Sequence, residues 1–404
     1  MKTLITTTAF AAIVGLANAK QWDVFNTSNS LLPSNVVTSV KVIGSEVWVG
    51  TESGVMVQND RGEQNDSILE NGILELEVND IAEKPNGDVW VATNDGIVIK
   101  KSNGSEILTV DNSGLPMNVI KTLMVDKTNK TWVGTWGGGL AVNSQEWQIY
   151  STANSGISSN GITALTEDNS GKIWVGTFNK GISVFDGQNW ETIDSSNSDL
   201  QSNIISSVYA DGAAVWIGTN SGMARYENGQ IVKFTTANTG IVFNQVNCFF
   251  RENNYLWIGT DGGLLRYDGS GFIAYNTANS GLPHNSVSSI DVDSFGNKWI
   301  GTSGGGLVEF NLSGIVQGVE DKALLADVQV YPNPYSERVN VSNNEKESLN
   351  YFITDISGAV LYKSNIAAGQ KIELPLNGYA SRQLFLTLEK DGRFEVLSLV
   401  GMEE

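Results

Sequence analysis

A tryptophan returns at nearly constant intervals along most of this chain of 404 residues. Each one begins the motif Trp-(Val/Ile)-(Gly/Ala)-Thr, and successive copies stand 41 or 42 residues apart. The copies begin at Trp48, Trp90, Trp132, Trp174, Trp216, Trp257 and Trp299. A fixed period of this length indicates an array of seven repeated structural units.

Every repeat has the same order of strand and turn signals, which is clearest in residues 285–310. Residues 287–292 alternate as a strand does, and residues 293–297 have the composition of a hairpin turn. The tryptophan strand, a glycine-rich loop and a third strand follow, and complete repeats add an aromatic-x-x-aromatic strand such as 147–150. Four short strands per repeat predict a propeller blade, whereas a β-helix or a leucine-rich solenoid needs a shorter period.

The two ends of the array are complementary. The seventh repeat stops after its third strand, while residues 22–25 (Trp-Asp-Val-Phe) match the fourth strand at 147–150. We therefore predict an all-β fold, a seven-bladed β-propeller in which residues 21–27 complete the last blade. Closure of this kind leaves only short outer edges, and the repeated tryptophans are expected to be apolar plates between neighbouring blades.

The first residues predict export. Residues 1–19 combine Lys2, an apolar stretch over 4–16 and a final Ala-Asn-Ala, which is the layout of a secretory signal peptide. No later run approaches the roughly 18 uninterrupted apolar residues of a membrane span, so we expect no transmembrane segment. The product is expected to be secreted or held at the outer-membrane surface.

The repeats resemble a known family. The sequence Trp-Ile-Gly-Thr-Asp-Gly-Gly-Leu-Leu-Arg-Tyr at 257–267, with Asn-Ser-Gly-Leu-Pro-His-Asn at 279–285, resembles the two-component regulator propeller repeat. The resemblance covers about residues 21–312 and departs from the pattern at 62–80, where an outer strand is hard to place. That repeat builds periplasmic sensor domains of hybrid histidine kinases, but this sequence has no kinase segment, so no signalling output is implied.

The last part of the chain resembles a second family. Val-Gln-Val-Tyr-Pro-Asn-Pro-Tyr at 328–335, with segments 353–358, 372–376 and 394–400, resembles the C-terminal sorting domain of the type IX secretion system. The resemblance implies a small immunoglobulin-like β-sandwich and the type IX secretion machinery as a partner. The predicted organisation is a signal peptide at 1–19, the propeller at 20–312, a linker at 313–326 and the sorting domain at 327–404.

Charge and residue supply restrict the chemistry. A formal charge of −19 would repel a phosphate backbone, so no nucleic-acid partner is expected. His284 and Cys248 are the only residues of their types, and we expect a variable loop residue and a small buried apolar residue, respectively. The glycine runs at 137–139 and 304–306 and the aspartate-rich turns are interpreted as turns. No cofactor is predicted, and calcium has no specific motif in its favour.

One position varies between repeats whose flanking residues hardly change. It follows each repeated threonine, in the loop between the second and third strands, which opens on the same face as the loops between blades. Its occupants are Glu52, Asn94, Trp136, Phe178, Asn220, Asp261 and Ser303. Variable loops on a constant scaffold are where propellers bind, so we predict that these residues ring the channel mouth and contact a ligand. The alternative is that they are ordinary solvated loop residues.

A second ring is formed by an asparagine 13 or 14 residues before the tryptophan, and we expect it to stabilise turns. It comprises Asn35, Asn118, Asn160, Asn203, Asn244 and Asn285.

These observations favour a non-enzymatic binding module for a small molecule, glycan or peptide. Trp136 and Phe178, at equivalent positions of adjacent blades, would suit stacking on sugar rings. A propeller lyase or hydrolase based on His284 is an alternative, and a structural or adhesion protein is a third.

Overall fold

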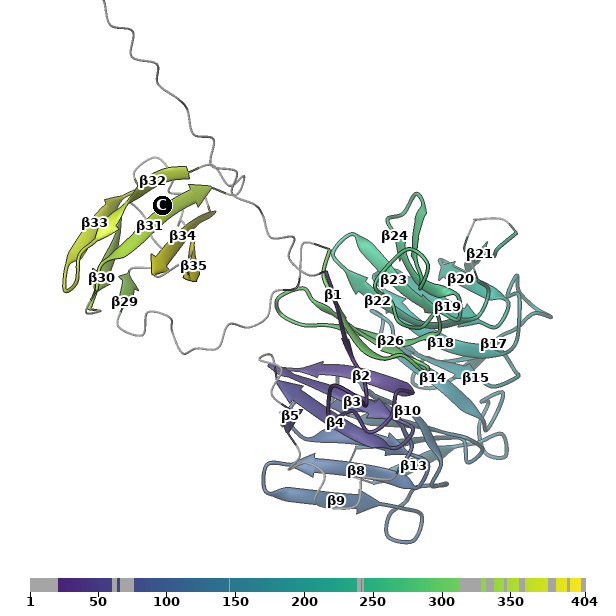
Figure 1. The fold of residues 1–404 in the computed structure, drawn as a ribbon. Coiled ribbons are helices and arrows are strands. Elements are labelled where there is room, and N and C mark those ends of the chain that lie inside the picture. Colours follow the sequence, from purple (N-terminus) through teal and green to yellow (C-terminus); the bar gives the residue numbers. More distant parts are fainter. Residues whose placement is uncertain are drawn as a thin grey trace, which may run out of the picture. The chain divides into compact units, whose positions relative to one another are not determined.

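The chain forms two compact units, at residues 1–317 and 318–404, in which the described residues are strands and turns without a helix (Figure 1). The computed structural model describes residues 21–59, 64–65, 76–144, 146–237, 241, 243–312, 315, 328–331, 338–344, 347–355, 360–376, 383–390 and 393–400. The predicted signal peptide and most of the predicted linker lie outside this set. The all-β class is confirmed.

The first unit contains seven antiparallel four-stranded sheets. Blade 1 is β2 (Val37–Ile43), β3 (Glu46–Thr51), β4 (Gly54–Asn59) and β5 (Gln64–Asn65), and blade 2 is β6 (Val78–Glu83), β7 (Val89–Thr93), β8 (Gly96–Lys101) and β9 (Gly104–Leu108). Blade 3 is β10 (Ile120–Val125), β11 (Thr131–Thr135), β12 (Leu140–Asn143) and β13 (Trp147–Tyr150), and blade 4 is β14 (Ile162–Glu167), β15 (Ile173–Thr177), β16 (Ile182–Phe185) and β17 (Trp190–Ile193). Blade 5 is β18 (Ile205–Asp211), β19 (Ala214–Thr219), β20 (Gly222–Glu227) and β21 (Gln230–Phe234), and blade 6 is β22 (Val246–Glu252), β23 (Tyr255–Thr260), β24 (Gly263–Tyr267) and β25 (Phe272–Tyr275). Blade 7 is β26 (Val287–Val292), β27 (Lys298–Thr302), β28 (Gly306–Phe310) and β1 (Trp22–Phe25).

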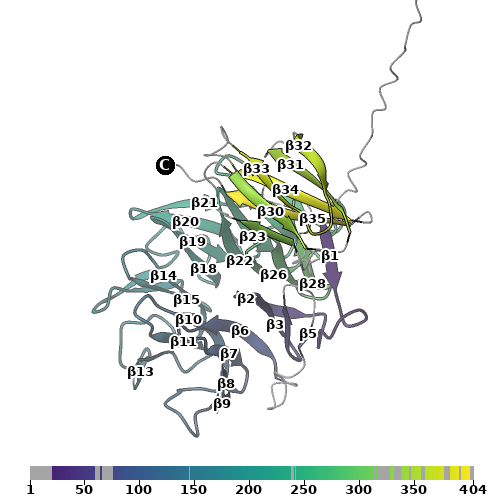
Figure 2. The same cartoon turned by 90° about the vertical axis from the view of Figure 1, so that its left-hand side faces the viewer.

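The first strands of the seven blades form a closed ring around the centre of the unit, as Figure 2 shows. Each first strand contacts those of its two neighbours, and β2 of blade 1 contacts β26 of blade 7. The strand β1 pairs with β28, and the rings of Trp22 and Phe310 stack with centroids 3.8 Å apart. The predicted closure by the N-terminal strand is therefore confirmed.

The repeated Gly-Thr pair brings the blades close together. A Cβ atom on Gly50 would lie 2.5 Å from a methyl group of Val78 in the next blade, so only glycine fits there without a shift. The buried Thr51 hydroxyl donates a hydrogen bond to the Gly54 carbonyl at 2.8 Å, which fixes the loop that follows. The pair is therefore structural.

The repeated tryptophans are buried between blades, with at most 5% of each side chain exposed. The sequence analysis did not predict that most of their indole N–H groups donate to a carboxylate. These pairs are Trp48–Glu46, Trp132–Asp126, Trp174–Asp168, Trp216–Asp211, Trp257–Glu252 and Trp299–Asp293, at 2.8 to 3.0 Å. In blade 2, Lys84 stands where Asp126 stands in blade 3, and the buried Trp90 Nε1 has no hydrogen-bond partner among the described residues.

Three of these aspartates, Asp126, Asp168 and Asp293, also stabilise the hairpin turns. One oxygen of Asp126 accepts hydrogen bonds from the backbone N–H groups of Thr128 and Lys130, while the other accepts from Trp132. Burial alone would raise the pKa of Asp126, but these hydrogen bonds hold the pKa below its ordinary value. The aspartate-rich turns are hairpin turns, as predicted.

The fourth strand of blade 1 is only two residues long, which agrees with the departure from the repeat pattern after residue 62. Residues 60–63 and 66–75 lie outside the described set.

The side chain of Cys248 packs into the core between blades 6 and 7, where burial raises the pKa of its thiol to about 12. The residue is partly buried, and its packing against apolar side chains agrees with the expected apolar role.

The second unit is a sandwich of two antiparallel sheets. One is β29 (Val328–Tyr331), β30 (Arg338–Asn343) and β33 (Lys371–Pro375), and the other is β32 (Val360–Ile366), β31 (Leu349–Asp355), β34 (Gln383–Lys390) and β35 (Arg393–Val400). Val341, Ile353 and Leu386 are fully buried between the sheets. The predicted immunoglobulin-like β-sandwich is confirmed, whereas the Pro-Asn-Pro segment at 332–334 lies outside the described residues.

Candidate functional site at the channel mouth

The variable residues lie beside the start of the ring of first strands. Their backbone N–H groups donate to the carbonyl of the residue that directly precedes the first strand of the same blade. These pairs are Glu52–Val36, Asn94–Glu77, Trp136–Val119, Phe178–Gly161, Asp261–Gln245 and Ser303–Ser286, at 2.9 to 3.2 Å. Asn220 follows Thr219 at the same position of blade 5. The loops between blades and the loops after the second strands therefore form one face, which we call the mouth.

The mouth carries an exposed aromatic pair on blades 3 and 4. Trp136 and Phe178 are 44% and 46% exposed, and their rings meet edge to face with centroids 4.8 Å apart. The sequence suggested two separate plates one blade apart, but the rings contact each other and form one apolar patch. The Nζ atom of Lys121 lies 5.7 Å from the centroid of Trp136.

The remaining variable residues take part in polar networks. Glu52 accepts from the Ser34 hydroxyl at 2.9 Å, and the Asn94 amide donates to Glu77. In blades 6 and 7, Asp261 accepts from Asn247 and from Ser286, whose hydroxyl also contacts Ser303. Blades 6, 7, 1 and 2 thus present hydrogen-bonding groups, whereas blades 3 and 4 present aromatic rings.

A circle of side-chain hydrogen bonds links the blades just inside the mouth. The second residue of a first strand donates to the carbonyl of the first residue of the next first strand. These bonds are Thr38–Val78, Asn79–Ile120, Ser206–Val246, Asn247–Val287 and Ser288–Val37.

The circle is interrupted in the blades that carry the aromatic pair. Lys121 of blade 3 turns back to the side-chain oxygens of Asn79 and Asn94, at 2.9 and 3.3 Å. The Thr163 hydroxyl of blade 4 is buried and has no hydrogen-bond partner among the described residues. The other five blades all make this inter-blade bond. Blades 3 and 4 therefore differ chemically from the rest of the ring.

The second ring, of asparagines, stabilises loops, as predicted. The side-chain oxygen of Asn160, for example, accepts from the backbone N–H of Thr152 at 2.8 Å. The same bond is made by Asn35, Asn118, Asn203, Asn244 and Asn285. This oxygen is therefore occupied by the fold.

His284 lies on the mouth but has no acid–base partner among the described residues. Its Nδ1 accepts from the Ser286 backbone N–H at 3.1 Å, and its ring covers the glycines at 304 and 305. The nearby Asp261 bonds to Ser286 and Asn247 instead. The part of the chain that the structure describes also contains no group of three or more metal-ligating side chains.

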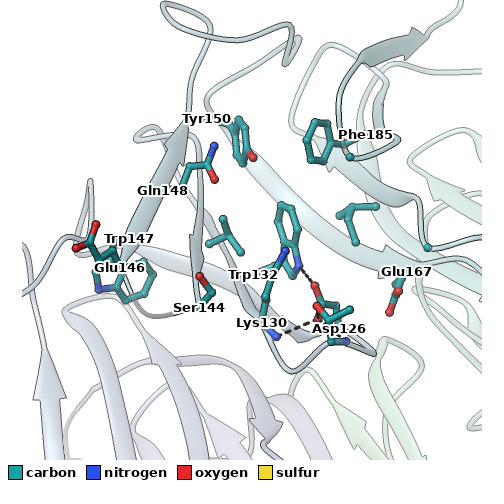
Figure 3. A pocket seen from close by; sticks show the side chains of 15 residues that line it. Asp126, Lys130, Trp132, Ser144, Glu146, Trp147, Gln148, Tyr150, Glu167 and Phe185 are labelled. Atoms are coloured by element: carbon teal, nitrogen blue, oxygen red, sulfur yellow. Dashed lines mark hydrogen bonds between the residues drawn. The ribbon is translucent and has the colours of Figure 1, made fainter.

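A pocket that the sequence analysis missed lies between blades 3 and 4 on the face opposite the mouth (Figure 3). It has a volume of about 610 Å³, and turns β10–β11 and β12–β13 form its rim. Trp132, Tyr150 and Phe185 line it beside Glu146 and Glu167. Tryptophans and aromatic fourth strands recur in other repeats, so no sequence signal distinguishes this junction.

Comparisons with solved structures identify the architecture. The extracellular domain of a hybrid two component system from B. thetaiotaomicron aligns with a TM-score of 0.62 and 18% identity over 95% of this chain. PorZ, a surface component of the type-IX secretion system of Porphyromonas gingivalis, aligns at 0.56 and 15% over 94%. This chain spans 58% and 61% of those two proteins. At these identities the likeness shows the fold alone.

A third structure represents an enzyme class. Virginiamycin B lyase from Staphylococcus aureus aligns with a TM-score of 0.57 and 13% identity, over 72% of this chain and 99% of the lyase. No curated protein has a significantly similar sequence. No membrane-spanning helix is found in the part of the chain that the structure describes.

Family models match both units. The model described as "Two component regulator propeller" matches residues 156–179, and the model described as "Secretion system C-terminal sorting domain" matches residues 329–400. The match at 329–400 indicates export through the type IX secretion system to the cell surface or beyond. The chain is thus a seven-bladed propeller, of which residues 156–179 match the two-component regulator repeat, joined to a unit whose residues 329–400 match the secretion system C-terminal sorting domain.

Proposed function

We propose that this exported propeller is a non-enzymatic binding module whose glycan or peptide ligand docks on the mouth. The observation that carries the proposal is the coincidence of the aromatic pair with the interrupted circle of hydrogen bonds. Trp136 and Phe178 expose nearly half of their surface, and Lys121 and Thr163 beside them do not make the inter-blade bond seen elsewhere. Exposed aromatic rings with a few polar groups around them are typical of ligand sites.

The surroundings of His284 favour binding over catalysis. A histidine base needs an unhindered ring nitrogen near the substrate and usually a group that orients the ring. Nδ1 of His284 accepts a backbone hydrogen bond, so the proton of the neutral ring is on Nε2, and Asp261 is engaged by two other side chains. The likeness to the lyase concerns the fold alone. The contacts of His284 support no acid–base role.

A screen of the mature full chain against oligosaccharides and peptides, followed by mutation of the first ligand found, tests the proposal. We expect Trp136→Ala/Phe178→Ala to weaken binding by about 2 kcal/mol or more, because partly desolvated aromatic residues are frequent hot spots. The matched control is Phe295→Ala/Ile273→Ala, which removes two apolar side chains of similar exposure away from the mouth.

The fold should survive the mouth substitutions. Trp136 and Phe178 belong to none of the buried core clusters, so the melting temperature should change little. Unchanged binding by a folded double variant would contradict the proposal. Mass spectrometry of the recovered ligand should find it intact, and a cleaved ligand would favour the lyase alternative.

A further inference from the structure

Four exposed apolar side chains lie on the mouth of blades 3 to 6. Trp136 and Phe178 are joined there by Ile204 in the loop before blade 5 and Phe243 in the loop before blade 6. Ile204 and Phe243 are 40% and 47% exposed, and Phe243 covers Gly262, the residue after Asp261. We call Trp136, Phe178, Ile204 and Phe243 the apolar sector.

Four carboxylates of the mouth lie on blades 6, 1 and 2. Glu52 and Asp261 occupy the variable position of blades 1 and 6, Glu77 precedes the first strand of blade 2, and Asp95 follows Asn94 in the same blade. We call these four residues the acidic sector. The Nζ atom of Lys121 lies over the Trp136 ring and donates to the side-chain oxygens of Asn79 and Asn94 in blade 2. The mouth thus presents both apolar side chains and carboxylates.

We propose, on the basis of the binding function argued above, that the mouth recognises a basic, apolar peptide segment of a partner protein. An aliphatic or aromatic side chain of the segment packs against the apolar sector, and its lysine or arginine side chains meet the carboxylates of the acidic sector. The complementarity of sign and of apolar surface identifies this occupant.

The geometry disfavours a sugar on the apolar sector. A pyranose stacks on a flat aromatic face, whereas Trp136 and Phe178 meet at 67° and form a corner. Sugar hydroxyls need hydrogen-bond partners on every side, and the four side chains of the apolar sector offer only the Trp136 indole N–H. A hydrocarbon side chain requires no such partner and gains from the burial of the apolar surface.

Three synthetic peptides of equal length test the inference by fluorescence anisotropy with the mature full chain. One alternates lysine and leucine, one lysine and serine, and one glutamate and leucine. We expect the lysine–leucine peptide to bind at least about tenfold more tightly than the other two, because only it satisfies both sectors. Added salt should weaken its binding by screening the acidic sector.

Paired variants separate specific docking from general attraction to an acidic protein. Trp136→Ala/Phe178→Ala and Glu52→Gln/Glu77→Gln should each weaken the lysine–leucine complex about tenfold. The matched controls are Phe295→Ala/Ile273→Ala and Glu83→Gln/Glu146→Gln, which alter exposed side chains away from the mouth and should bind as the unmodified chain does.

The inference is overturned if the lysine–serine peptide binds as tightly, or if control and mouth variants weaken binding equally. If an oligosaccharide from the screen depends on Trp136 and Phe178 while no peptide does, the binding module stands and the peptide class is wrong. If neither kind of ligand responds to the mouth variants, both proposals fail.

Discussion

Blade 2 allows a direct test of how the tryptophan–carboxylate pairs stabilise the propeller. Its tryptophan, Trp90, is 5% exposed, and its indole N–H has no acceptor among the described residues. Lys84 occupies the acceptor position, and its Nζ atom lies 5.3 Å from the centroid of the Trp90 ring. Lys84→Asp should restore the bond that Asp126 makes to Trp132 at 2.8 Å.

The expected gain follows from two opposing effects. A buried donor without a partner costs about 1–3 kcal/mol, and a hydrogen bond to a charged acceptor contributes about 1.5–3 kcal/mol. Loss of the Lys84 ammonium over the ring removes about 0.5–1 kcal/mol at a half-exposed site. We therefore expect Lys84→Asp to stabilise the propeller by about 1 kcal/mol, or roughly 2–4 °C for a unit of this size.

Calorimetry of the propeller transition measures this change, and two variants control it. Lys84→Ala removes the ammonium without an acceptor and should lower stability slightly. Trp90→Phe should abolish the gain from Lys84→Asp, because no N–H remains to be paired. If Lys84→Asp is no more stable than Lys84→Ala, the reasoning about the unpaired indole is refuted.

Three further predictions concern the ends of the chain and its carboxylates. Deleting residues 20–28 should destabilise the propeller by about 4 kcal/mol or more, because it removes Trp22 and Phe25 from blade 7; an unchanged melting temperature would contradict the role of β1 in closure. A chain that ends at Gly318 should remain folded in the periplasm, and fractionation that finds normal amounts outside the cell would refute the sorting role of residues 327–404. Stability should fall as the pH drops below about 4, because hydrogen bonds hold the pKa values of Asp126, Asp168 and Asp211 below the unfolded value of about 3.9. Burial raises the pKa of Asp80, so the contribution of Asp80 to stability changes with pH in the opposite direction. Thermal unfolding between pH 7 and pH 3 measures this loss, which should be smaller in Asp126→Asn/Asp168→Asn, and a flat profile for the unmodified chain would contradict it.

Repetition explains why the fold could be predicted from the sequence. The tryptophan period defined seven blades, and the match between residues 22–25 and the fourth strand at 147–150 identified the closing strand. Both are local patterns with a local physical cause. The predicted domain limits at 312 and 327 are untested, since most residues between them lie outside the described set.

The site was harder to predict, because it depends on contacts between blades. Comparing repeats identified Trp136 and Phe178 as variable residues, but it could not show that their rings touch. The Thr163 hydroxyl stands out because five blades make the inter-blade bond and two do not. This difference lies in contacts between blades, which the sequence of one repeat does not show. Ile204 and Phe243 add exposed apolar side chains to the mouth from the loops between blades. The comparison of repeats considered only the residue after each repeated threonine, so it did not include them.

Hydrogen exchange of the mature full chain, with and without the first ligand found, tests the binding site most directly. We expect protection in residues 117–119, 136–138, 161–163 and 178–180, which form the mouth of blades 3 and 4. Protection confined to the turns around Glu146 and Glu167, which border the pocket on the opposite face, or to residues 328–400, would contradict a ligand site at the mouth.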